Sequence, residues 1–389
     1  MKPNRTLALA AAAALAAAVC APSFVSAADA PAKPAKPAEA PKATAPKAEA
    51  PKPKATQVWT DPADATLPAD FKIQGEYAGE IAGGGPLGAQ VIALGNGTFQ
   101  AVLLPGGLPS AGWDGKQKIL LAGKLAGDKA TFAPAEGKRK YLGQSPDEFS
   151  ATSKFPPEGQ KAYTAEIAAD GQSLAGKTDD GKAFALKRAA RVSPTLGAKP
   201  PEGAKVLFDG TSKGAFKGGK FDEAKKVLNT EGQDIKSTDK FMGYTMHVEF
   251  MLAYRPEARG QGRGNSGFYQ GDHYEVQILD SFGLDGKNNE CGGVYTKAEP
   301  KVNMCLPPLV WQTYDVEFTP AVYDAAAKKK TANARLTVRH NGVLIHDNIE
   351  INGPTGGARN EPEGTPGGIT LQGHGNPTQF RNIWVVEKK

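Results

Sequence analysis

Most of the chain consists of short runs in which apolar and polar residues alternate, a pattern typical of half-buried β-strands. In Tyr244–Met251 the alternation places Met246 and Val248 on one face and His247 and Glu249 on the other. Further alternating runs cover residues 313–318, 334–339 and 368–372, while residues 205–210 open the region and 382–386 close it as a last strand. Glycine turns separate these runs, and Asn341-Gly342 is a strong hairpin signal. From residue 203 to the end, the pattern predicts an antiparallel two-sheet sandwich or jelly roll.

A second group of apolar runs precedes this region, at residues 88–94, 99–104, 118–123, 163–167 and 183–186. The Gly-Asn-Gly sequence at residues 95–97 joins the first two runs as a hairpin turn would. These runs predict a small β-rich domain over residues 57–195, followed by a proline-containing linker at 193–201. The residues of this domain form no recognisable catalytic group, so a packing or adhesion module is the simplest interpretation.

The N-terminal 56 residues carry targeting and tether signals rather than a fold. Lys2 and Arg5 precede an apolar run from Leu7 to Val19, and small residues lead to an expected cleavage after Ala27. This pattern is typical of a secretory signal peptide over residues 1–27, too short to cross a membrane. Residues 28–56 are rich in Ala, Pro and Lys and predict an extended linker. We therefore expect an exported protein without a transmembrane segment, in the periplasm or outside the cell.

The charge distribution and the cysteines bear on three properties: nucleic-acid binding, disulfide formation and metal binding. The 389-residue chain has a formal net charge of +6, but much of the excess lies in the Lys-rich linker. No stripe of basic and aromatic residues follows, so we expect no nucleic-acid partner. After the signal, Cys291 and Cys305 remain, and in an oxidising compartment they are expected to form a disulfide. Two unpaired buried thiols are the alternative. No CxxC or HxxxH spacing indicates a metal site.

One stretch places polar side chains together on a strand face. In the sequence GNSGFYQGDHYEVQILD, residues 264–280, Glu275 and Gln277 share one face, with Val276 and Ile278 on the other. Solvation of an exposed strand is one explanation and a sugar-binding groove on the outer face of a sheet is another. By residue type and phase, the groove candidates are Glu249, Tyr269, Glu275, Gln277, Tyr295, Gln372 and His374. His374 could instead cap its turn, and Arg381 could simply pair with Glu249.

Several ordered motifs in this region resemble one family. They are Gly243-Tyr244 with His247–Phe250, Gly264–Tyr269, Tyr274–Ser281, Cys291–Tyr295, Trp311–Phe318, Asn341–His346, Gly353–Ala358, and Leu371–Pro377 with Phe380–Trp384. Together, and in this order, they resemble the 3-keto-disaccharide hydrolase domain, also described as a 3-keto-glucoside lyase/hydratase domain. The resemblance spans nearly all of residues 204–387. One position departs from it, because Gly373 stands where the family usually has Asp.

The resemblance implies a concanavalin-like jelly roll and a carbohydrate substrate already oxidised at C3, which a sugar dehydrogenase would supply as a partner upstream. A ketone at C3 acidifies the C2 proton, so a base can remove it while the aglycone leaves from C1, and water then adds. Glu275 and His374 are the candidates for proton transfer. Gln277, Asn265 and Arg381 are candidates to hold sugar hydroxyls or the developing oxyanion.

Tyr269, Tyr295, Glu249 and Gln372 complete the expected substrate-binding set. A divalent cation on Glu275 and His374 is an open alternative. A non-catalytic carbohydrate-binding or envelope-associated protein is a second reading of the same residues. A conventional two-carboxylate hydrolase is disfavoured, because Glu275 and Asp280 are an odd number of residues apart and would point to opposite faces of a strand.

Overall fold

The structure is a computed structural model that describes residues 57–358 and 362–388. The signal peptide and the linker expected over residues 1–56 lie outside the described residues. The described chain is all-β apart from two short helices, α1 (Ala69–Ile73) and the 3₁₀ turn η1 (Gly260–Gly262). No helix in this described part is both long and apolar enough to cross a membrane.

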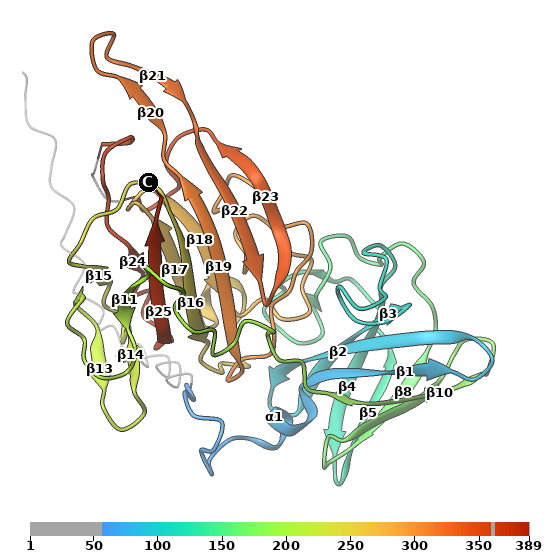
Figure 1. The fold of residues 1–389 in the computed structure, drawn as a ribbon. Helices are drawn as coiled ribbons and strands as arrows, with labels where there is room; N and C mark the ends of the chain where they lie inside the picture. The colour runs from blue at the N-terminus through green and yellow to red at the C-terminus, as the bar shows by residue number, and fades with distance from the viewer. Residues whose placement is uncertain (1–56, 359–361, 389) are drawn as a thin grey trace, which may run out of the picture. The chain divides into compact units, whose positions relative to one another are not determined.

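The N-terminal region closes into an antiparallel β-barrel of eight strands (Figure 1). Its strands, in barrel order, are β1 (Gly75–Ile81), β10 (Ala183–Ala189), β9 (Ser173–Lys177), β8 (Thr164–Ala168), β5 (Lys129–Pro134), β4 (Ile119–Ala126), β3 (Thr98–Pro105) and β2 (Gly85–Gly95). The short strands β6 (Lys140–Tyr141) and β7 (Phe149–Ser150) pair outside the barrel. The predicted runs all appear as strands, and closure of the sheet leaves the barrel without free edges.

Strands β2 and β3 are buried on both of their faces. Val91 and Leu103 belong to the apolar cluster inside the barrel. Ile92 and Val102, one residue along on each strand, belong instead to the cluster that fills the C-terminal region. This double burial explains why these two strands read as nearly continuous apolar runs rather than as alternating ones.

The C-terminal region consists of two antiparallel sheets and a small hairpin. The larger sheet contains β13 (Lys220–Asp222), β14 (Val227–Asn229), β25 (Gln379–Glu387), β16 (Tyr244–Met251), β19 (Trp311–Thr319), β22 (Ala334–His340) and β23 (Val343–Ile351), with β11 (Lys205–Phe208) also paired to β25. The smaller sheet contains β12 (Phe216–Lys217), β15 (Ile235–Ser237), β24 (Thr370–Leu371), β17 (Asn265–Gln270) and β18 (Tyr274–Leu279). Strands β20 (Val322–Asp324) and β21 (Lys329–Ala332) form the hairpin.

Side chains from both sheets fill one apolar core, as the alternation predicts. Met246 and Val248 of the larger sheet and Phe268 and Val276 of the smaller one lie in the same buried cluster. The Asn341-Gly342 turn joins β22 to β23, with positive φ angles of 50° and 79°. Both residue types tolerate this left-handed conformation, so the predicted hairpin is confirmed.

The expected Cys291–Cys305 disulfide is wrong for this structure, in which both thiols are free and buried. Each sulfur has a polar neighbour within the core. The Cys291 Sγ lies 3.2 Å from the Tyr314 hydroxyl, and the Cys305 thiol donates to the Leu279 carbonyl oxygen at 3.5 Å. The core therefore accommodates the two thiols as small, weakly polar side chains, which is the alternative that the sequence left open.

Candidate functional site

Six of the predicted groove residues gather in one depression on the smaller sheet. Strands β17 and β18 pair so that Tyr269 faces Glu275 and Gly267 faces Gln277. Strand β24 runs beside β17 and leads into Gln372 and His374. We call this depression, of about 200 Å³, the Glu275 pocket; its lining residues are Gln261, Tyr269, Glu275, Gln277, Tyr295, Gly356, Gly357, Gln372 and His374.

Glu275 lines this pocket, and the residue is 2% exposed. The Tyr269 hydroxyl donates a hydrogen bond to its Oε2 atom at 2.7 Å. The Gln372 amide in turn donates to the Tyr269 oxygen at 3.3 Å. This chain of donors orients a nearly buried carboxylate toward the pocket, an arrangement suited to a general base.

A second polar chain runs along the other side of the pocket. The Gln277 amide donates to the Gln261 side-chain oxygen at 3.2 Å. The Asn265 amide donates to the same oxygen at 3.1 Å and lies 3.3 Å from His374 Nδ1. His374 itself is exposed at the mouth, whereas Asn265 is buried. The pocket thus combines a buried carboxylate, buried and half-buried amides, and an exposed imidazole.

Backbone pairing holds the remaining wall against β18. The backbone N–H of Tyr295 donates to the Glu275 carbonyl oxygen at 3.0 Å, and the backbone N–H of Gln277 donates to the Gly293 carbonyl oxygen at 2.8 Å. The Thr355 hydroxyl accepts a hydrogen bond from the Glu275 amide at 3.0 Å. These contacts bring Tyr295 and the Gly356–Gly357 turn to the pocket from segments outside the sheet.

Sequence reasoning missed Gln261, Gly356 and Gly357. Gln261 lies in the 3₁₀ turn η1, where no strand alternation could mark it. Its amide donates to the Asn289 carbonyl at 2.8 Å, which fixes the side chain across the pocket wall. Gly356 contributes a backbone carbonyl 3.0 Å from the Tyr269 hydroxyl, a contact that residue type does not reveal.

Strand β6, which lies outside the barrel, reaches the loop behind Gln261. The Tyr141 hydroxyl donates to the carboxylate of Glu290, whose other oxygen accepts the Gly286 and Lys287 amides at 2.8 and 2.9 Å. Burial raises the pKa of Glu290, which is 1% exposed. Glu290 follows Asn289, whose carbonyl accepts from Gln261, so the contact with Tyr141 supports one wall of the Glu275 pocket.

A steric constraint accounts for Gly373, which stands where the resembled family usually has Asp. A Cβ atom on Gly373 would lie 2.3 to 2.5 Å from backbone atoms of Gln233. The Gly373 amide also donates to the Asp234 side chain at 3.0 Å. An aspartate at this position would therefore require the 233–234 backbone to move, and in this chain the nearby carboxylate comes from Asp234 instead.

Glu249 and Arg381 are not part of the Glu275 pocket, which corrects the expectation that they bind substrate beside Glu275. Both lie on the larger sheet, where β16 pairs with β25. The Arg381 guanidinium donates to Glu249 at 2.6 Å and lies 4.0 Å from the centre of the Trp311 ring. Strand phase identified an outward-facing pair correctly, but it could not say which of the two sheets carried the groove.

The linker after the barrel covers this outer face of the larger sheet. The Gly197 amide donates to Glu249 at 2.6 Å, and the Ala198 carbonyl accepts from Asn382 and Trp384. Glu249 is consequently only 1% exposed although it points away from the core. A structural role in fastening the linker therefore accounts for Glu249.

Hydrogen bonding makes the Glu249 carboxylate strongly acidic. Burial works against its charge, but hydrogen bonds from His247, Asn382 and Arg381 prevail and lower its pKa to about 2. His247 Nδ1 lies 2.6 Å from an Asp315 oxygen. Burial also opposes protonation of His247, yet the contacts with Asp315 and Glu249 raise its pKa above the ordinary value.

We expect Glu249→Gln to lower the free energy of unfolding at pH 7 by about 2–3 kcal/mol, because buried donors lose their charged acceptor. The contribution is complete above the ordinary glutamate pKa of 4.5 and is lost as the pH falls toward 2. Urea unfolding from pH 7 to pH 3 should therefore show the two proteins converging. Glu350→Gln removes an exposed pair with Arg335 and should change stability by less than about 1 kcal/mol. Equal losses in both variants would contradict the prediction.

The structure also bears on two further expectations: the role of Asp280 as a second carboxylate, and a divalent cation on Glu275 and His374. Asp280 is buried away from the pocket, 2.9 Å from Arg263, and burial raises its pKa. Among the described residues, no three His, Cys, Asp or Glu side chains converge as a cation site. The Glu275 pocket offers one carboxylate and one imidazole, and its other side-chain donors are neutral. This set could supply two ligands of an ion, so Glu275 and His374 would be the residues to hold one.

This chain is similar to known proteins over about half of its length. Among curated proteins, none matches this chain. A crystal structure from Parabacteroides distasonis ATCC 8503, described as a "putative glycosyl hydrolase", is 29% identical and covers 48% of this chain and 85% of its own, with a TM-score of 0.41. A second with the same description and source is 17% identical and covers 48% of this chain and 95% of its own, with a TM-score of 0.36. Residues 203–386 of the chain match the family model of the 3-keto-alpha-glucoside-1,2-lyase-like domain.

Proposed function

We propose that this protein is a carbohydrate-active enzyme that cleaves 3-keto-glycosides in the Glu275 pocket. The match of residues 203–386 to the lyase-like domain supports the substrate class. The observation that carries the proposal is the geometry at Glu275, a carboxylate 2% exposed that the Tyr269 hydroxyl orients at 2.7 Å. A concanavalin-like jelly roll is consistent with the two antiparallel sheets around one core.

The first step is an elimination across C1 and C2 of the sugar. Glu275 accepts the C2 proton, whose acidity comes from the neighbouring C3 ketone. The electrons of the broken C–H bond form the C1=C2 double bond as the C1–oxygen bond breaks, and the aglycone leaves with that oxygen. In the second step, water adds across the double bond: its hydroxyl goes to C1, its remaining proton goes to His374, and the proton held by Glu275 returns to C2. The products are the 3-keto-sugar and the protonated aglycone.

The other pocket residues complete this chemistry. His374 is exposed at the entrance, where its imidazole can give a proton to the departing oxygen. The side-chain amides of Gln277, Asn265 and Gln372 line or adjoin the pocket wall, where they can donate to the C3 oxygen as it gains negative charge. Tyr295 can cover one face of the sugar ring. A bound divalent cation, held by Glu275 and His374, would supply further polarisation of the ketone.

The decisive experiment incubates the full-length protein with an aryl 3-keto-α-glucoside and follows release of the free phenol. The same aryl glucoside without C3 oxidation serves as the control substrate, and each reaction is run with and without a chelator. We expect release from the oxidised substrate alone, which makes a C3-oxidising dehydrogenase the reaction that must come before this one. Equal release from both substrates would contradict the mechanism, because it would not need the ketone.

Retention of a 3-keto-glucoside without turnover would instead support the second candidate, a non-catalytic carbohydrate-binding protein. The two candidates separate at Glu275: binding should survive its neutralisation, whereas cleavage should not. We further propose that the chain is exported after cleavage following Ala27, on the strength of residues 1–27. N-terminal sequencing of the protein from an exporting host should then begin at Ala28, and a retained Met1 would contradict export.

A further inference from the structure

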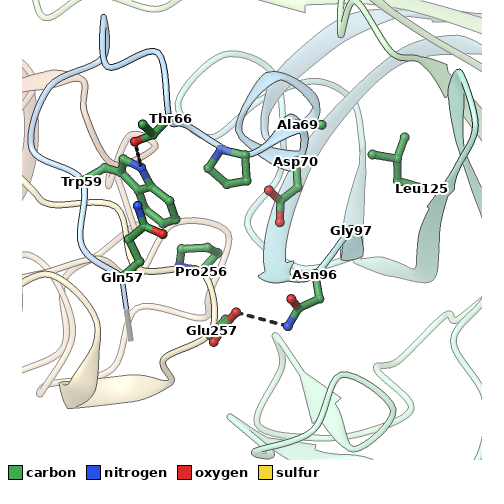
Figure 2. Close-up of a pocket in the computed structure, with 11 residues that line it drawn as sticks. Gln57, Trp59, Thr66, Ala69, Asp70, Asn96, Gly97, Leu125, Pro256 and Glu257 are labelled. Carbon is green, nitrogen blue, oxygen red and sulfur yellow. Dashed lines mark hydrogen bonds between the residues drawn. The ribbon is translucent and has the colours of Figure 1, made fainter. Parts of the chain in front are cut away.

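A separate cavity of about 320 Å³ lies where α1 and the β2–β3 turn approach the loop after β16 (Figure 2). We call it the Trp59 pocket. Its walls come from Trp59 and Pro256 on one side and from Asp70, Asn96 and Leu125 on the other. Its volume falls near the lower end of the range for small-molecule sites, about 300–1,000 Å³.

Asp70 is an unusual feature of this cavity. The residue is 2% exposed, and within the described part of the chain neither carboxylate oxygen has a partner in good hydrogen-bond geometry. The Gly97 amide and the Tyr254 hydroxyl are near enough to influence its charge but do not form well-aligned bonds. Figure 2 shows the carboxylate directed into the open space of the pocket. Buried carboxylates normally have partners, so this one is arranged to receive a donor from outside the chain.

The charge of the pocket indicates which kind of donor fits. Glu257 lies at its rim, where the Asn96 amide donates to it at 3.2 Å. Burial, together with the nearby Glu257 charge, raises the pKa of Asp70. None of the eleven lining residues is Lys, Arg or His, so no basic side chain in the lining compensates these two acids. A positively charged ligand would offset the cost of burying the charge of Asp70 and would also offset its repulsion by Glu257.

The indole of Trp59 supplies a second recognition element. Its Nε1 donates to the Thr66 hydroxyl at 3.1 Å, and the Trp59 amide and carbonyl exchange hydrogen bonds with Tyr254 at 3.2 and 2.9 Å. These contacts fix the ring as one wall of the cavity, opposite Asp70 (Figure 2). Aromatic faces attract cations, most strongly when the site is partly shielded from water.

We propose that the Trp59 pocket binds a small organic cation, a primary ammonium group carried on a compact polar body of about the size of an amino sugar. Asp70 would pair with the ammonium group, Trp59 would pack against the body of the ligand, and Asn96 and Glu257 would meet its polar edge. This site is independent of the proposed lyase reaction and gives the N-terminal barrel a ligand-binding role.

Calorimetric titration of the full-length protein with glucosamine tests the proposal, with glucose and N-acetylglucosamine as uncharged comparators. We expect glucosamine alone to bind. Asp70→Asn, which keeps the shape of the side chain, should weaken binding about tenfold or more. Glu257→Gln at the rim should weaken it about two- to fivefold. Glu80→Gln, which removes an exposed acid elsewhere on the barrel, and Glu275→Gln should both leave the affinity unchanged.

Several outcomes would overturn the proposal. Equal binding of the three sugars would show that charge is not recognised, and absence of glucosamine binding would show that the cavity has no such ligand. Full affinity in Asp70→Asn would place the ligand elsewhere. Calcium binding that depends on Asp70, without glucosamine binding, would assign the pocket to an inorganic cation. Because Asp70→Asn removes a buried charge, its unfolding midpoint should not fall, so loss of binding would not reflect loss of the fold.

Discussion

Glu275→Gln is expected to lower the rate of 3-keto-glucoside cleavage by about 10²- to 10⁴-fold, the range over which a general base contributes. Glutamine has the size of glutamate and can still accept the hydrogen bond that Tyr269 donates at 2.7 Å. It cannot accept the C2 proton. The pocket should therefore keep its shape and bind substrate while the elimination step fails. Release of the phenol at saturating substrate measures the rate, and calorimetry measures substrate binding.

Glu317→Gln is the matched control for this variant. Glu317 is exposed on β19 of the larger sheet and pairs with the end of the Lys388 side chain at 2.8 Å. The same chemical change there should leave the cleavage rate unaltered. If Glu275→Gln kept at least half of the wild-type rate with its thermal unfolding unchanged, Glu275 would not be the base. The non-catalytic candidate would be favoured only if the wild type also showed no turnover.

Strand alternation predicted the face on which Glu275 lies because successive side chains of a strand point to opposite faces. Val276 and Ile278 are fully buried in the core, so Glu275 and Gln277 must point outward between them. The same argument placed Glu249 outward on β16, also correctly. It could not separate a groove from a covered face, because coverage by the 193–199 segment depends on contacts distant in sequence.

Residues outside the strands were beyond this reasoning. Gln261 reaches the pocket from a 3₁₀ turn, and Gly356 acts through its carbonyl oxygen. Closure of the N-terminal strands into a barrel was not predicted either, because the pairing of β1 with β10 joins segments about a hundred residues apart. Local pattern therefore predicted the elements well, whereas the assembly of the pocket walls required the three-dimensional structure.

The gathering of Tyr269, Glu275, Gln277, Gln372 and His374 is the point at which pattern and family resemblance agree. The alternation predicted which face of its strand each residue lies on, and the family resemblance predicted that these residues share one site. Neither indicated the space that the carboxylate needs. That space is provided by Gly267, which faces Gln277 across the ladder and lies beside the Glu275 side chain.

Gly267→Ala is expected to reduce cleavage by about 10²-fold, the loss that a misplaced reacting group can cause. A Cβ atom on residue 267 would lie 2.2 Å from Glu275 Oε1 and 2.9 Å from its Cδ. The carboxylate is the flexible end of a side chain, so it should move aside rather than unfold the sheet. The Tyr269 hydrogen bond would then be lost, and the base would no longer face C2 of the sugar.

Two comparisons separate this effect from general damage. Gly214→Ala should keep full activity, because a Cβ there meets only the Ser212 hydroxyl oxygen, at an ordinary 3.4 Å. The double variant Gly267→Ala, Glu275→Gln should be no slower than Glu275→Gln alone, since residue 267 acts through the carboxylate. Additive losses in the double variant would show that Gly267 has another role. An unfolding midpoint far below that of the wild type would show that the added methyl group disrupts the β17–β18 pair. In that case the Glu275 carboxylate would not simply have moved aside.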